Sequence, residues 1–232
     1  MRDTLKQVLA TAWPVMLSYV PVGTACGVLA AQAGMEPWMS FVMGATFLSG
    51  SGQFMMSSLY MAGLPVLSIA ASVSAISLRF ALYSASFAPH LARAPRGMQA
   101  AVTGTFTEEA YGISLAKLVE GKNWSATHAL VLNLALLITW ALSCLAGTLL
   151  GGTVDIPTAL ASFACTSLFI CLLFSQEARR GNVVAAAVAA LALIVCKWLG
   201  LASVAVPVAA ALGVAAAVLV GAIAPVAGEG AK

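Results

Sequence analysis

Residues 37–78 read PWMSFVMGATFLSGSGQFMMSSLYMAGLPVLSIAASVSAISL and contain no charged side chain. A helix that crosses a bilayer needs about 20 apolar residues, so these 42 residues are enough for two crossings. The sequence Ala62-Gly63-Leu64-Pro65 predicts a turn between them, because glycine and proline interrupt regular structure. The stretch therefore predicts two apolar segments, 40–61 and 66–87.

The composition of the whole chain agrees with this pattern. Of its 232 residues, 61% are apolar and 8% are charged, whereas a soluble domain has about 25% charged residues. An ordinary soluble enzyme, a nucleic-acid-binding protein and a disordered protein are thereby excluded. The apolar runs are unbroken and do not alternate with polar residues, which excludes an outer-membrane barrel. The predicted fold is an all-α, polytopic helical bundle in a lipid bilayer.

The gaps between charged residues define the number of apolar segments. Eight are predicted, near 12–33, 40–61, 66–87, 100–119, 128–150, 158–177, 182–200 and 204–225. The connections are too short for a soluble domain, so residues 1–232 are expected to form a single transmembrane transporter domain. The first segment is expected to be a retained helix, because it is too long for the apolar core of a signal peptide.

Lysine and arginine in short loops favour the cytoplasmic side, and here they leave two topologies open. Eight plain crossings with a cytoplasmic N-terminus place Arg93 and Arg96 outside, against this rule. If segments 40–61 and 100–119 are broken or re-entrant and return to the side they came from, both arginines lie inside. Both interpretations predict cytoplasmic termini.

Ionisable residues within membrane segments are costly and are therefore candidates for function. Lys197 lies near a segment end and can extend to the interface. Arg79 and Glu108 lie 14 to 15 residues on either side of the loop centre near residues 93–94, which predicts an ion pair at similar depth. Glu109 points about 100° away from Glu108 on a helix, so it is the better candidate for carrying a proton. A static ion pair that only orients two helices is the structural alternative.

Polar and helix-breaking residues extend this candidate site. Ser72, Arg79, Tyr83 and Ser86 form a polar stripe on one helix face, which lines a cavity or a contact between helices. Broken helices can expose backbone groups to substrate, and an amino-acid zwitterion suits such a site. The predicted substrate-binding residues are Pro21, Gly23, Gly50, Ser51, Gly52, Gln53 and Tyr83, with Arg79, Glu108 and Glu109 as the coupling or ion-pair group.

Cysteine and histidine give no sign of a metal site. The five cysteines lie inside predicted segments without a CxxC pair and are interpreted as packing residues. His90 and His128 lie at predicted membrane edges. No metal and no cofactor are predicted.

Several ordered motifs in the first half resemble the AzlC family. They comprise Leu17-Ser18-Tyr19-Val20-Pro21-Val22-Gly23, Ser49-Gly50-Ser51-Gly52-Gln53-Phe54, Leu78-Arg79-Phe80-Ala81-Leu82-Tyr83 and Thr107-Glu108-Glu109-Ala110-Tyr111. Phe80 stands where the family usually has histidine, and Glu108 stands where it usually has aspartate. Residues 13–111 carry the resemblance, and the later half adds no motif.

The resemblance implies the large subunit of a two-component permease in the cell inner membrane. Such proteins export branched-chain amino acids together with a small hydrophobic AzlD-type membrane subunit. The alternatives are a passive channel or a structural membrane subunit. An enzyme is not expected: an intramembrane hydrolase using Ser49 or Ser51 with His128 has no supporting motif. The absence of a nucleotide-binding motif leaves a proton gradient as the possible source of coupling.

Overall fold

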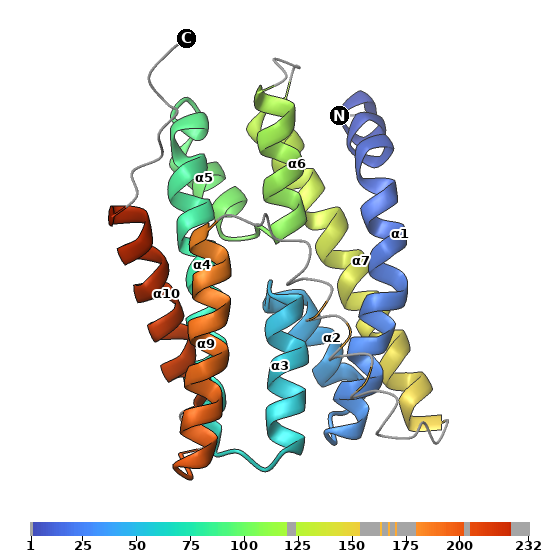
Figure 1. Cartoon of the computed structure of the whole chain (residues 1–232). Coiled ribbons are helices and arrows are strands. Elements are labelled where there is room, and N and C mark those ends of the chain that lie inside the picture. The colour runs from blue at the N-terminus through green and yellow to red at the C-terminus, as the bar shows by residue number, and fades with distance from the viewer. Residues whose placement is uncertain are drawn as a thin grey trace.

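The computed structural model describes residues 2–119, 124–153, 180–201 and 205–223, together with Phe163, Ser167 and Ile170. All regular elements in these ranges are helices, as the composition predicts (Figure 1). They are α1 (Arg2–Gln32), α2 (Pro37–Thr46), α3 (Gly50–Met61), α4 (Val66–Phe87), the 3₁₀ helix η1 (Ala88–Leu91), α5 (Arg96–Thr103), α6 (Glu108–Val119), α7 (Ala126–Thr153), α9 (Arg180–Trp198) and α10 (Ala205–Ile223).

Among the described residues, four helical stretches are long and apolar enough to cross a membrane. They are Asp3–Gln32, Val66–Leu91, Ala126–Thr153 and Arg180–Trp198, and α10 contains a shorter apolar helix, Val208–Val220. These match five of the predicted segments, while most of segment 158–177 lies outside the described residues. The molecule is an all-α membrane bundle.

Segments 40–61 and 100–119 are each split into two short helices. The first is divided between α2 and α3 at residues 47–49, and the second between α5 and α6 at residues 104–107. In Figure 1, α2 and α3 lie in the lower half of the molecule, whereas α5 and α6 lie in the upper half. Neither segment is one continuous helix, so the prediction that both are broken is confirmed. That each segment returns to the side of the membrane it came from stays a prediction.

Side chains explain why both segments break and turn back. The hydroxyl oxygen of Ser49 accepts a hydrogen bond from the Gly52 amide (3.1 Å), and that of Thr107 accepts one from the Ala110 amide (3.2 Å). Each hydroxyl thus caps the N-terminus of the second helix, α3 or α6. The end of α2 is satisfied by Gln53, whose amide nitrogen donates to the Phe47 carbonyl at 2.7 Å.

The other hairpin has an equivalent support from a different helix. The Asn133 amide on α7 donates to the Val102 carbonyl at the end of α5 (2.9 Å) and to the Thr105 hydroxyl (3.0 Å). Gln53 and Asn133 are both fully buried. Buried polar side chains therefore replace water at the free carbonyls of two helix ends inside the bundle.

The two hairpins repeat one pattern in opposite orientations. Helices α3 and α6 both have 12 residues, and their first residues, 50 and 108, are 58 positions apart. Each hairpin follows a long helix, and α1 and α4 run in opposite directions (Figure 1). Inverted repeats of this kind place substrate sites where the repeats meet in many transporters.

Helices α1 and α7 pack through glycines on both sides. Gly23 and Gly27 on α1 and Gly147 and Gly151 on α7 each form a G-x-x-x-G pair, which allows close helix approach in membranes. A Cβ atom built on Gly27 would lie 2.0 Å from the Cys144 carbonyl oxygen. Residues 2–32 form one helix that contains both Pro14 and Pro21.

Candidate functional site

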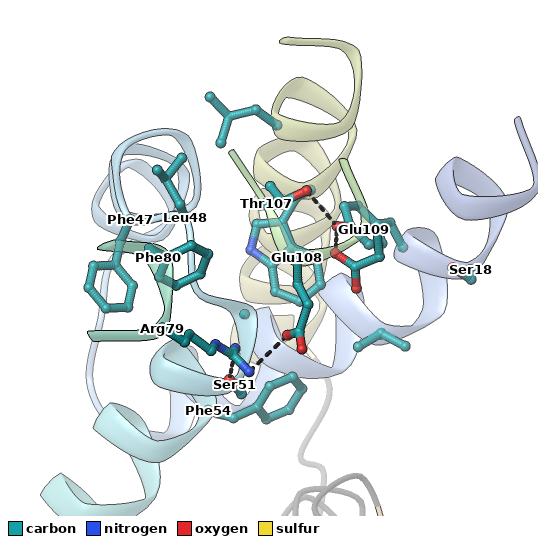
Figure 2. A pocket seen from close by; sticks show the side chains of 15 residues that line it. Ser18, Phe47, Leu48, Ser51, Phe54, Arg79, Phe80, Thr107, Glu108 and Glu109 are labelled. Atoms are coloured by element: carbon teal, nitrogen blue, oxygen red, sulfur yellow. Dashed lines mark hydrogen bonds and ion pairs between the residues drawn. The ribbon is translucent and has the colours of Figure 1, made fainter. Parts of the chain in front are cut away.

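A partly open cavity of about 170 Å³ lies where the two hairpin tips meet the long helices (Figure 2). It is lined by residues from α1, from the tip and start of α3, from α4, from the tip and start of α6, and from α7. These residues are Ser18, Tyr19, Val22, Phe47, Leu48, Gly50, Ser51, Phe54, Arg79, Phe80, Thr107, Glu108, Glu109, Leu137 and Trp140.

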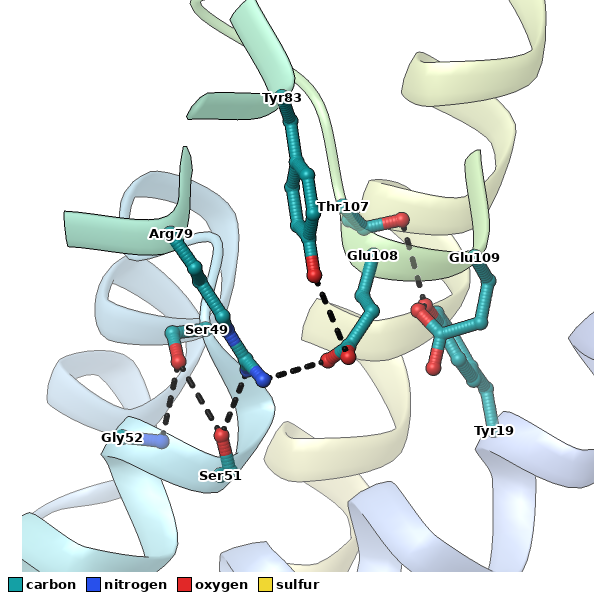
Figure 3. A network of polar contacts seen from close by, with 9 residues as sticks. All are labelled: Tyr19, Ser49, Ser51, Gly52, Arg79, Tyr83, Thr107, Glu108 and Glu109. Carbon is teal, nitrogen blue, oxygen red and sulfur yellow. Dashed lines mark hydrogen bonds and ion pairs between the residues drawn. The ribbon is translucent and has the colours of Figure 1, made fainter. Parts of the chain in front are cut away.

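Arg79 connects the two hairpin tips. Its Nη1 lies 2.9 Å from Oε2 of Glu108 at the start of α6, and its Nη2 donates to the Ser51 hydroxyl at the start of α3 (2.8 Å) (Figure 3). The ion pair that the equal loop distances predict is therefore present. The two side chains are 28% and 38% exposed, so they form a wall of the cavity and are not sealed inside the protein.

Glu109 has a different set of partners from Glu108. The Tyr19 hydroxyl on α1 donates to the Glu109 carboxylate and also lies 3.4 Å from Oγ1 of Thr107. The Tyr19 ring packs edge-on against Trp140 on α7, with ring centroids 5.2 Å apart. Two adjacent carboxylates thus face different helices, as their predicted angular separation requires.

The polar stripe on α4 faces mainly toward α6. Tyr83 points its hydroxyl at Glu108 at 3.5 Å and stacks on Tyr111, and the Ser86 hydroxyl lies 2.8 Å from the Tyr111 hydroxyl. Ser72 is buried and donates to the Ser68 carbonyl of its own helix. Most of the stripe therefore lies at a contact between helices, next to the cavity.

The predicted substrate-binding residues divide into two groups. Gly50 and Ser51 line the cavity, as do the three residues of the predicted coupling group. Among the others, Gly52 is buried beside Phe47 and Ser49.

Gln53 lies behind the cavity wall. It is fully buried, and its Oε1 accepts a hydrogen bond from Nε1 of Trp140 at 3.1 Å. The buried thiols of Cys26 and Cys144 also lie within 3.8 Å of Oε1. The geometry gives Gln53 a supporting position under the hairpin tip.

The remaining predicted positions lie on α1 and α4. Gly23 packs against Ser143 of α7, Pro21 is exposed on the outside of α1, and Tyr83 contacts Glu108 from beside the cavity. His128 bonds Ser125 and Gln7. It is therefore not brought together with the serines at the start of α3.

The cavity also includes residues that were not predicted as site residues. Tyr19 and Thr107 lie within the motifs that resemble the AzlC family. Thr107 directly precedes Glu108 in the sequence, and this position was the signal that could have identified it as a site residue. Trp140 and Leu137 lie in an apolar helix of the second half, where nothing in the sequence distinguishes them from lipid-facing residues.

The cavity has an apolar wall and a charged wall. Phe47, Leu48, Phe54, Phe80, Leu137 and Trp140 supply apolar surface. One guanidinium and two carboxylates supply the charge. Such a site can hold a small molecule with one apolar part and charged groups of both signs.

The sequence of the chain is similar to known membrane proteins. The family model described as "AzlC protein" matches residues 14–154. The chain is 28% identical over 188 residues to "Inner membrane protein YgaZ" of Escherichia coli (strain K12), covering 77% of this chain and 76% of that protein. No solved structure matches.

Proposed function

The chain belongs to the AzlC family of membrane proteins, and from this membership and the central cavity we propose that it is the large subunit of a permease that exports branched-chain or related apolar amino acids. The observation that carries the proposal is the cavity itself. It combines an aromatic and aliphatic wall with a guanidinium and two carboxylates in one partly open cavity. An apolar amino acid has the matching apolar side chain, carboxylate and ammonium.

The size of the cavity supports a small substrate. A cavity of about 150 Å³ can bind benzene in a protein interior. The volume here, about 170 Å³, suits a molecule of similar or slightly larger size. Valine, leucine and isoleucine are of this size, whereas a peptide is not.

We further propose that export is coupled to protons and that Glu109 carries the proton. Arg79 pairs with Glu108 and not with Glu109, whose hydrogen-bond partner is the Tyr19 hydroxyl. A carboxylate without a paired cation accepts a proton at lower electrostatic cost. The charged or titratable groups around Glu109 are Arg79, Glu108, Tyr83 and Tyr19.

The expected partner is a small hydrophobic AzlD-type subunit. The family resemblance implies it, and the structure leaves apolar surface for lipid and for such a chain. In the apolar 18-residue stretches of these candidate spans, 17% of residues are buried within Val66–Leu91 and 6% within Arg180–Trp198. These two faces are the expected contact regions.

We propose that the upper end of the molecule in Figure 1 faces the cytoplasm. The start of α1, the connection from η1 to α5 and the end of α6 lie at this end. These parts contain Arg2, Lys6, Arg93, Arg96 and Lys117. The positive-inside rule then gives a cytoplasmic N-terminus, and α10 runs toward the same side of the molecule.

Transport into inverted membrane vesicles tests the function. Labelled leucine, valine, isoleucine and methionine are supplied with and without a pH gradient, to vesicles that contain the chain with its small subunit. Gradient-driven uptake of the branched-chain amino acids is expected. Uptake that ignores the gradient supports the passive-channel alternative, and no uptake of any of the four contradicts the proposal.

The variant Glu109→Gln tests the coupling group. It removes the titratable group and keeps the size and hydrogen-bonding capacity of the side chain. We expect normal expression and substrate binding with loss of gradient-driven uptake. Normal uptake with normal pH dependence would exclude Glu109 as the proton carrier.

A further inference from the structure

The donor groups of Arg79 are only partly used. Nη1 pairs with Glu108 and Nη2 with Ser51, but Nε is buried without a hydrogen-bond partner among the described residues. A guanidinium offers five N–H groups in a planar fork that matches a carboxylate with two parallel bonds. A buried donor without a partner is unfavourable, so an oxygen ligand at this fork would be stabilised.

Glu108 contacts the Arg79 guanidinium through one carboxylate oxygen, and this arrangement permits another carboxylate to replace it. One carboxylate oxygen contacts one nitrogen at 2.9 Å, and the other lies 3.5 Å from the Tyr83 hydroxyl, which is a long hydrogen bond. The side chain is 38% exposed and lines the cavity. An arriving carboxylate has the same chemistry as this internal one and can compete for the same donors.

The surrounding charges favour one orientation of a zwitterion. Ser51 lies in the first turn of α3, which has no acidic residue, and Arg79 of α4 donates a hydrogen bond to it. The first turn of α6 carries Glu108 and Glu109. The α3 side therefore attracts a carboxylate and the α6 side an ammonium group, with the aromatic wall left for the apolar side chain.

We propose that Arg79 recognises the α-carboxylate of the substrate by exchanging Glu108 for it, and that the released Glu108 receives the α-ammonium. One internal ion pair is replaced by two pairs with the ligand, so no charge is left without a partner. The inference rests on the proposed function, since it assumes an amino-acid substrate. It gives Arg79 and Glu108 a role in binding that a static ion pair does not have.

Binding of three ligands to the purified full chain with its small subunit tests the exchange. They are leucine, 3-methylbutylamine, which lacks the carboxylate, and 4-methylpentanoate, which lacks the ammonium. In the wild type, leucine should bind about ten- to hundredfold more tightly than the amine, as the loss of charged hydrogen bonds implies. Equal binding of leucine and the amine would overturn the proposal without any variant.

Glu108→Gln gives the sharper result. Because the internal competitor is removed and Arg79 is kept, 4-methylpentanoate should bind at least tenfold more tightly than to the wild type. Glu109→Gln is the matched control, since it removes the same charge from the neighbouring position but leaves the Arg79 pair intact. An equal gain in both variants would reflect general electrostatics and would overturn the exchange.

The double variant Arg79→Gln, Glu108→Gln leaves no unpaired charge from the broken ion pair. It should lose the preference for leucine over the amine and the gain for 4-methylpentanoate. Retention of either would overturn the role of Arg79. If the wild type binds none of leucine, valine, isoleucine and methionine, the proposed function itself is wrong. If the wild type binds leucine without using Arg79, only the exchange is wrong.

Discussion

Replacing Gly27 by alanine should destabilise the bundle strongly for such a small change. The added Cβ would lie 2.0 Å from the Cys144 carbonyl oxygen and 2.8 Å from the Thr148 amide nitrogen. Both neighbours are backbone atoms of α7, so no side-chain rotation relieves the clash. Helices α1 and α7 must separate by about 1 Å or more to restore an ordinary contact.

The cost follows from two effects. Overpacking of a tight interface costs about 1–3 kcal/mol. Separation also lengthens the hydrogen bond from the Thr148 hydroxyl to the Gly27 carbonyl, now 3.0 Å, which contributes about 0.5–1.5 kcal/mol. The sum, about 2–4 kcal/mol, corresponds to a melting temperature lower by about 5–15 °C for a chain of this size.

Reaction of buried thiols with a fluorogenic maleimide during heating measures this change. Cys26 and Cys144 carry buried thiols next to the α1–α7 interface, so they become reactive when it opens. Gly112→Ala on α6 is the matched control, because a Cβ there meets nothing within 4 Å. Alanine is the better helix former, so this control should melt at the same temperature or slightly higher.

The comparison has a clear negative outcome. If Gly27→Ala and Gly112→Ala melt together with the wild type, α1 and α7 do not approach as closely as the structure places them. Tyr19, which α1 holds against Glu109, would then need another explanation for its position.

Two further predictions concern the support of the first hairpin by Gln53 and the orientation of the chain in the membrane. Gln53→Leu should lower the melting temperature, because it leaves the Trp140 indole N–H and the Phe47 carbonyl without their partner; an unchanged temperature would contradict the supporting role of Gln53. Single cysteines next to Lys232 and at Arg93, in a chain without its native cysteines, should both resist a membrane-impermeant thiol reagent added from outside. Labelling at Lys232 would contradict the cytoplasmic C-terminus, and labelling at Arg93 would contradict the proposed orientation.

Much of the fold could be predicted because the bilayer restricts the choices. Long charge-free stretches give the helices, and the lysine and arginine positions left open that two segments are broken. The equal loop distances of Arg79 and Glu108 correctly predicted their ion pair, although Glu108 begins α6 after the break at residues 104–107 and does not lie on one continuous helix antiparallel to α4. These predictions depend only on chain length and charge.

The parts that could not be predicted depend on contacts between distant segments. Gly23 was predicted to bind substrate, but it packs against Ser143 on α7. Gln53 stood in a Gly-rich break and was assigned to substrate, whereas its hydrogen bonds run to the hairpin backbone and to Trp140. A polar side chain that supports a backbone break and one that faces a ligand look alike in sequence.

The repeated hairpins also explain why the two sides of the cavity differ in charge. Both tips share a hydroxyl cap, Ser49 or Thr107, so both present a helix N-terminus to the centre. The next two positions differ: they are Gly50 and Ser51 in the first hairpin and two glutamates in the second. The inverted architecture brings the two tips together, and the differing residues then make a neutral, donor-rich side and an acidic side. Arg79 lies between them and binds both, so the polarity of the site arises from sequence differences within a symmetric scaffold.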